Sequence, residues 1–88
     1  MVTWRLVVSK QAKKDYKKIV RAGLKPQLLR LLTILKTNPY QNPPPFEKLS
    51  GDFYGAFSRR INIHHRLVYQ VADDAKTVKI FLMWTHYK

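Results

Sequence analysis

Three arginines in the segment GAFSRRINIHHRLVYQV, residues 55–71, are the first candidates for chemistry. An arginine fork binds phosphate bidentately and stabilises the negative charge that grows during phosphoryl transfer. Arg59 and Arg60 are adjacent and point to opposite faces of a strand, whereas Arg60, His64 and Arg66 share one parity. The pattern predicts a basic row on one face of a sheet, where a phosphate backbone would bind. The alternative is that these arginines are solvated or paired with the few acids.

The sequence has a single glutamate, Glu47, in the segment PPFEKLSG just before the basic residues. Cleavage of RNA by its own 2′-hydroxyl needs a base for that hydroxyl, an acid for the leaving oxygen and cations for the phosphorane. Glu47 is the candidate base. Nearby arginines lower the pKa of a carboxyl group and weaken it as a base, while burial beside Phe46 would raise that pKa. The alternative is a loop salt bridge from Glu47 to Lys48 or to an arginine.

Two histidine-containing pairs complete the candidates. His86 could donate a proton near neutral pH, and Tyr87 could orient it, stack on a base or bind phosphate. The alternative for this pair is a terminal strand whose aromatic rings fill the edge of the core. His64 and His65 are interpreted as turn residues. Neither pair has the companion ligands of a metal site and the sequence has no cysteine, so we expect no metal and no cofactor.

The charge balance points to a polyanionic partner. Seventeen Lys and Arg face five Asp and Glu, which gives a net charge of +12 in 88 residues. Such a balance favours nucleic acid as the partner, with a solvated cationic surface or an anionic membrane surface as alternatives. The chain has enough apolar residues for one small core, so a single domain over residues 1–88 is expected. No apolar run suits a signal peptide or a membrane span, which predicts a soluble, cytoplasmic protein with no membrane partner.

Helices and strands must position these side chains. Residues 3–8, TWRLVV, predict a strand, and Ser9 is a good N-cap for the helix KQAKKDYKKIVRAG. Gly23 is a plausible stop for that helix, whose lysine-rich face is interpreted as a docking surface. Pro26 lies near the first turn of a second helix with a leucine stripe, and that helix ends at Asn38 before a proline.

The second half of the chain predicts a loop followed by strands. NPYQNPPPFEKLSGDFYG is proline-rich and is predicted to be irregular. AFSRRINI, RLVYQV and TVKIFLMW predict three strands joined by the turns HH and ADDAK. The expected class is α+β: an N-terminal strand, a helical hairpin and a three-stranded antiparallel meander, in the order β-α-α-β-β-β. Both helices should pack on one face of the sheet, which leaves the other face for a ligand.

Taken together, these segments resemble a known family. PFEKLSGDFYGAFSRRINIHHRLVYQV and the later HY resemble the YoeB/Txe branch of the RelE-type toxins, which are ribosome-dependent mRNA endoribonucleases of bacterial type II toxin–antitoxin systems. The resemblance implies a microbial ribonuclease fold and metal-independent cleavage of mRNA in the A site of the 70S ribosome. It also implies a cognate antitoxin, with operator DNA contacted only through the toxin–antitoxin complex.

The resemblance assigns a role to each matching position. Glu47 corresponds to the general base, Arg66 to the arginine that stabilises the transition state, and His86 to the general acid. Tyr87 corresponds to the terminal tyrosine of the site, and Arg60 to a further phosphate-binding arginine.

Two more basic residues, Arg59 and Lys48, complete the set expected to bind substrate or phosphate. The sequence departs from the family pattern at Ser50, where relatives commonly have lysine, and at Lys88, which follows the terminal HY. A non-catalytic RNA- or DNA-binding module is the alternative function, and an inactive relative that serves only as a binding partner is a third possibility.

Overall fold

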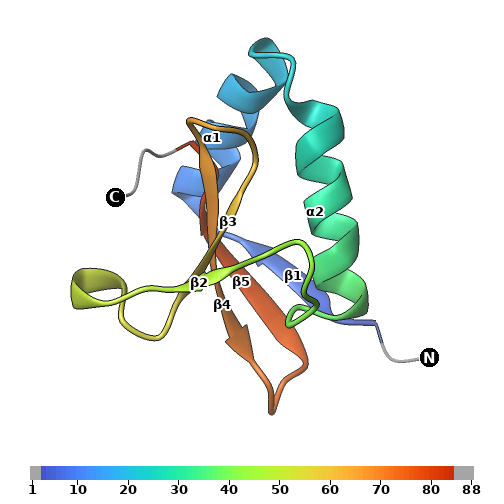
Figure 1. Ribbon diagram of the computed structural model, residues 1–88, viewed down its shortest axis with the longest axis vertical. Coiled ribbons are helices and arrows are strands. Elements are labelled where there is room, and N and C mark those ends of the chain that lie inside the picture. The colour runs from blue at the N-terminus through green and yellow to red at the C-terminus, as the bar shows by residue number, and fades with distance from the viewer. Residues whose placement is uncertain (1–2, 85–88) are drawn as a thin grey trace.

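The computed structural model describes residues 3–84, which form two helices and a five-stranded sheet (Figure 1). The elements are β1 (Arg5–Val8), α1 (Lys10–Arg21), α2 (Lys25–Thr37), β2 (Glu47–Lys48), β3 (Phe57–Arg60), β4 (Arg66–Ala72) and β5 (Thr77–Leu82). The predicted α+β class and the order of the predicted elements are confirmed. The structure adds β2 and a short 3-10 helix (Gly51–Phe53) within the segment that was predicted to be irregular.

The predicted signals for starting and ending the helices are present in the structure. Ser9 caps α1, because its side chain accepts a hydrogen bond from the backbone nitrogen of Ala12 at 3.0 Å. The chain turns after α1 at Gly23, whose φ of 75° lies in the left-handed region that glycine favours. Pro26 lies in the first turn of α2, and the helix stops at the extended residue Asn38. Within residues 3–84, neither helix is long and apolar enough to cross a membrane.

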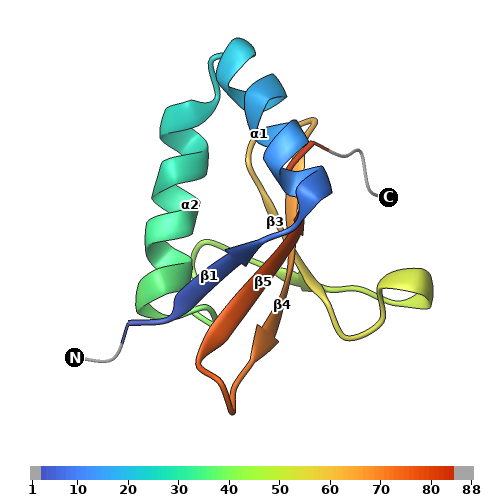
Figure 2. The same cartoon turned by 180° about the vertical axis from the view of Figure 1, so that it is seen from behind.

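The sheet has the strand order β1-β5-β4-β3-β2. β3, β4 and β5 form the predicted antiparallel meander, and β2 adds to its edge. β1 pairs with β5 in parallel, and the two strands lie side by side in Figure 2. The last strand in chain order is therefore an internal strand of the sheet.

The main core lies between the two helices and one face of the sheet. Alternation brings every second residue of β4 and β5 to this face. The buried side chains at its centre are Ala12, Ile19, Leu28, Leu31, Leu35, Leu67, Tyr69, Val78 and Ile80. Both helices therefore pack on one face, as predicted.

A smaller apolar cluster covers part of the opposite face. Leu49 and Ala56 fold over the buried side chain of Val68, and Phe53 and Phe81 pack against them. The segment before β3 therefore covers Val68 and Phe81, which lie on the outer face of β4 and β5, and removes them from water. The face that was expected to be left for a ligand is therefore partly covered. The uncovered part beside β2 and β3 holds the candidate site.

Candidate functional site

A cleft opens on the face of the sheet that points away from the helices. Its volume is about 350 Å³, and its lining residues are Pro44, Pro45, Glu47, Ser58, Arg60 and Arg66. The strand register creates it, because Glu47 lies opposite Ser58 and Arg60 lies opposite Arg66 on neighbouring strands. Directly opposed residues place their side chains on the same face. The structure therefore brings together Glu47, Arg60 and Arg66, three residues that the sequence singled out separately.

Glu47 and Arg66 face each other across the cleft. Oε1 of Glu47 lies 3.6 Å from Nη1 of Arg66, which is longer than a tight charge-assisted hydrogen bond. The glutamate side chain is 64% exposed and the arginine side chain 20% exposed. An ion pair this open contributes about 0–1 kcal/mol to stability. The pair therefore matters more for what it can bind than for the fold.

Arg60 places a second positive charge beside Arg66. The two arginines are directly opposed on β3 and β4, and Arg60 is exposed. Opposed like charges on neighbouring strands repel each other. Within residues 3–84, the only acid that forms an ion pair with either of them is Glu47, which contacts Arg66. An anion bound between the two guanidinium groups would relieve this repulsion, so the cleft has the electrostatics of a phosphate site.

Arg59 lies on the other face of β3 and is buried, with 1% of its surface exposed. Its Nε donates to the hydroxyl of Tyr69 at 2.8 Å. Its terminal nitrogens donate to the backbone oxygens of Pro44 at 2.6 Å, Pro39 at 3.0 Å and Gln41 at 2.8 Å. The prediction that Arg59 binds phosphate is therefore wrong, because its donors are used inside the fold. These hydrogen bonds hold the loop before β2, which ends at Pro44 and Pro45 on one side of the cleft.

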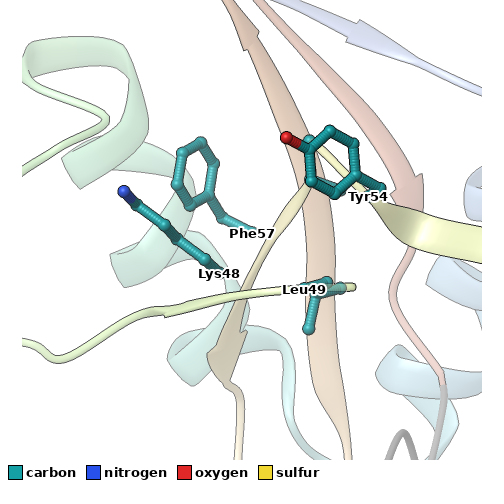
Figure 3. Close-up of a pocket in the computed structure, with 6 residues that line it drawn as sticks. Lys48, Leu49, Tyr54 and Phe57 are labelled. Atoms are coloured by element: carbon teal, nitrogen blue, oxygen red, sulfur yellow. The ribbon is translucent and has the colours of Figure 1, made fainter. Parts of the chain in front are cut away.

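Lys48 is separated from Glu47 by the alternation of β2. It lies opposite Phe57, whereas Glu47 lies opposite Ser58, so the two side chains leave the strand on different sides. Figure 3 shows Lys48 in another pocket, where it lies with Leu49, Phe57 and Tyr54. This pocket has a volume of about 280 Å³. Lys48 therefore does not line the Glu47–Arg66 cleft, and its contact with phosphate stays a prediction.

The two histidines between β3 and β4 occupy the predicted turn. The side-chain oxygen of Asn62 accepts from the backbone nitrogens of His64 and His65 at 2.9 and 2.7 Å, which fixes the turn. The ring of His65 stacks on Trp84, with centroids 3.7 Å apart. Among residues 3–84, no group of three His, Asp or Glu side chains could hold a metal ion.

His86 and Tyr87 lie outside the described residues, so their predicted roles are not tested by the geometry.

Asp15 is a buried acid that holds the chain after β5, and its side chain is 1% exposed. Its Oδ2 accepts from the backbone nitrogen of Met83 at 3.0 Å, and Gln11 donates to its Oδ1 at 2.9 Å. This buried acid was not predicted from the sequence. Its spacing from the apolar residues of the first helix was the available signal.

Ser58 was also missed, although it lines the cleft. It is 1% exposed, and it lies on β3 between the buried Arg59 and the apolar Phe57. Its parity with Arg60 was the signal that could have placed it on the cleft face. A serine gives little sign of its role by residue type alone.

Comparisons with known proteins agree with this fold. Residues 8–87 match the family described as "YoeB-like toxin of bacterial type II toxin-antitoxin system". The protein named Toxin YoeB from Mycobacterium bovis (strain ATCC BAA-935 / AF2122/97) is 36% identical over 52 residues, which make up 59% of this chain. The match covers 61% of the length of that relative.

Solved structures extend the similarity over almost the whole chain. The YoeB/ParE toxin from Agrobacterium tumefaciens superimposes with a TM-score of 0.83 at 29% identity, covering 94% of this chain and 99% of that one. A chain of the heterotetrameric YoeB-YefM toxin-antitoxin complex from Staphylococcus aureus gives a TM-score of 0.75 at 32% identity, covering 96% and 98%. The family match over residues 8–87 shows that the chain belongs to the YoeB-like toxins of bacterial type II toxin–antitoxin systems.

Proposed function

We propose that this protein is a ribosome-dependent mRNA endoribonuclease, the toxin of a toxin–antitoxin pair, which cleaves translated mRNA in the ribosomal A site. The observation that carries the proposal is the open cleft in which Glu47 faces Arg66 at 3.6 Å, with Arg60 beside them. A carboxylate and two guanidinium groups supply a base and the cations for a phosphorane. The family membership supports the same activity.

The reaction needs no group other than side chains. Glu47 removes the proton from a ribose 2′-hydroxyl, and the oxygen attacks the adjacent phosphorus. Arg66 and Arg60 stabilise the extra negative charge on the phosphorane oxygens. The 5′-oxygen of the next nucleotide then leaves with a proton from His86, which gives a 2′,3′-cyclic phosphate and a free 5′-hydroxyl. In this scheme Tyr87 orients His86, and no metal ion takes part.

The charge distribution supports the expected partners. The exposed face of α1 carries Lys10, Lys13, Lys14, Lys17, Lys18 and Arg21, and the chain as a whole carries +12. Such a surface steers the protein toward ribosomal RNA. The cognate antitoxin would be an acidic protein that covers the cleft, and it would connect the toxin to operator DNA. We place this activity in the cytoplasm, where translated mRNA is found.

Primer extension on a translated message tests the proposal. Purified protein is added to a translation reaction with and without ribosomes, and we expect cuts at fixed codon positions only when ribosomes translate the message. Glu47→Gln should lower the rate of cleavage by about 10²–10⁴-fold, because it removes the base. Asp74→Asn is the matched control, since Asp74 is exposed and lies in the β4–β5 turn away from the cleft.

The same assay separates the alternative function. A non-catalytic binding module would inhibit translation without cutting the message, and Glu47→Gln would inhibit as strongly as the unmodified protein. Cleavage that persists undiminished in Glu47→Gln, Arg66→Ala and His86→Ala would rule out the proposed mechanism.

A further inference from the structure

Ser58 carries a buried hydroxyl that has no hydrogen-bond partner among residues 3–84. The residue is 1% exposed, and its Oγ has no hydrogen bond in the part of the chain that the structure describes. Buried side-chain polar atoms in folded proteins nearly always have a partner, because leaving one unpaired costs stability. The hydroxyl of Ser58 is therefore a position where the fold alone leaves a hydrogen-bonding group unused.

Ser58 lies on the cleft face of β3 and not on its core face. Ser58 lines the cleft together with Glu47, Arg60 and Arg66. In the register it stands directly opposite Glu47 on one side and Val68 on the other. It therefore belongs to the floor of the cleft, between the strand that carries the carboxylate and the strand that begins with Arg66.

The neighbouring residue makes the contrast clear. Arg59, one position further along β3, is equally buried, but its guanidinium makes four hydrogen bonds, to one hydroxyl and three backbone oxygens. The fold thus provides hydrogen-bond acceptors for the Arg59 guanidinium on the core face of β3. Among residues 3–84 it provides no partner for the Ser58 hydroxyl on the cleft face. Alanine would fill the space of Ser58 without an unpaired polar atom, so the fold gains nothing from the hydroxyl.

We propose that the Ser58 hydroxyl is a substrate-binding group, which donates a hydrogen bond to a non-bridging oxygen of the phosphodiester held by Arg66. This inference rests on the proposed function, because it takes the ligand to be RNA. Phosphate oxygens accept hydrogen bonds strongly, and they become better acceptors as negative charge grows on the phosphorane. The contact should therefore strengthen in the transition state and affect the rate more than the binding of RNA.

Ser58→Ala tests the inference through four readouts: cleavage rate, RNA affinity, stability and pH profile. We expect the single-turnover rate of mRNA cleavage on programmed ribosomes to fall by about 10²-fold, the effect of removing one donor to a developing charge. The cleavage rate of Ser58→Cys, which keeps a weak donor, should lie between those of the unmodified protein and Ser58→Ala. The denaturation midpoint of Ser58→Ala should equal or exceed that of the unmodified protein, since the variant removes an unpaired hydroxyl.

Control and binding measurements complete the design. Thr33→Ala is the matched control, because it removes an exposed hydroxyl from α2, which donates to the backbone oxygen of Leu29. The binding probe is a fluorescein-labelled RNA trinucleotide with a 2′-deoxy central nucleotide, which cannot be cut at that position. Ser58→Ala should weaken its binding by about 2–10-fold, the loss of one hydrogen bond.

Three results would overturn the inference. Unchanged cleavage and unchanged trinucleotide affinity would mean that the hydroxyl does not contact RNA. A lower denaturation midpoint with a parallel loss of activity would make Ser58 a packing residue. A shift in the acidic limb of the pH–rate profile with the plateau intact would mean that the hydroxyl acts on Glu47 and not on phosphate. If the unmodified protein cuts no translated RNA, the proposed function fails, and the trinucleotide affinities alone decide the contact.

Discussion

Arg59 and Arg60 are neighbours on β3 and yet have opposite environments. Arg59 is 1% exposed and donates to four acceptors, three of which are backbone oxygens of the loop before β2. Arg60 is exposed in the cleft, opposite Arg66. The two faces of one strand thus separate a guanidinium that holds the loop beside the site from one that is exposed in the cleft. Net charge alone does not distinguish these two uses of arginine.

The largest expected effect is on the cleft face. Arg66→Ala should lower the rate of mRNA cleavage by about 10²–10³-fold, because it removes a cation from the developing phosphorane. Its free energy of unfolding should change by at most about 1 kcal/mol, since the ion pair with Glu47 is open to solvent. Cleavage on programmed ribosomes and urea denaturation measure the two effects. Arg30→Ala, an exposed arginine on α2, is the control. A variant that loses stability and activity together would contradict the division between the two faces.

The core face should respond in the opposite way. Arg59→Met should lower the free energy of unfolding by about 3–5 kcal/mol, because several acceptors lose their donor and each such loss costs about 1–3 kcal/mol. Arg60→Met is the matched variant one residue away, and it should change stability by no more than about 0.5 kcal/mol. Both are measured by urea denaturation. Equal effects at the two positions would show that Arg59 is not the anchor that its contacts indicate.

Tyr69, whose hydroxyl accepts from Arg59, should contribute part of this stability. Tyr69→Phe removes the acceptor of Arg59 Nε, and it should cost about 1.5–3 kcal/mol, the range for hydrogen bonds to charged groups. Burial raises the pKa of Tyr69, and the Arg59 guanidinium only partly offsets this. The usual pKa of tyrosine is about 10. A folded-state pKa above this value contributes stability that is fully present below about pH 10 and is lost as the pH rises through the folded-state pKa.

The pH dependence of stability is therefore best measured as the difference in free energy of unfolding between the unmodified protein and Tyr69→Phe. The unmodified protein should lose its stability advantage over Tyr69→Phe as pH rises above about 10. Lysine titration occurs in both proteins, so it cancels in the difference. An advantage that grew with pH would contradict the assigned direction of the shift.

The smallest expected effect lies at the start of the loop that Arg59 holds. The hydroxyl of Tyr40 donates to the carboxylate of Asp73, with distances of 2.9 and 3.0 Å to its two oxygens. Tyr40→Phe should cost about 0.5–1.5 kcal/mol of stability and leave cleavage unchanged, because the bond is exposed and neither residue lines the cleft. Urea denaturation and primer extension measure these effects. A strong loss of cleavage would mean that the loop transmits changes to the cleft.

The sequence was sufficient to predict most of the fold, because its signals are local. Ser9, Gly23 and Pro26 each act within a few residues, and helical and strand periodicity marks the buried faces. β2 escaped prediction because two residues carry no periodicity, and only their pairing with β3 defines them as a strand.

The candidate site was predictable in its residue types but not in its arrangement. Parity placed Arg59 and Arg60 on opposite faces, and the apolar Phe57 and Ile61 share the parity of Arg59. That pattern indicates the core face, but a lone arginine among apolar residues finds its acceptors only through the tertiary fold. The separation of Lys48 from Glu47 likewise depends on β2.

The parallel pairing of β1 with β5 has a consequence for the synthesis of the molecule. Arg5 pairs with Thr77, and β5 lies between β1 and β4. A growing chain that has not yet reached residues 77–82 leaves β1 and β4 with no strand between them. The sheet can therefore be completed only after β5 has been synthesised. A nascent chain that ends before residue 77 therefore lacks the strand that joins β1 to β4.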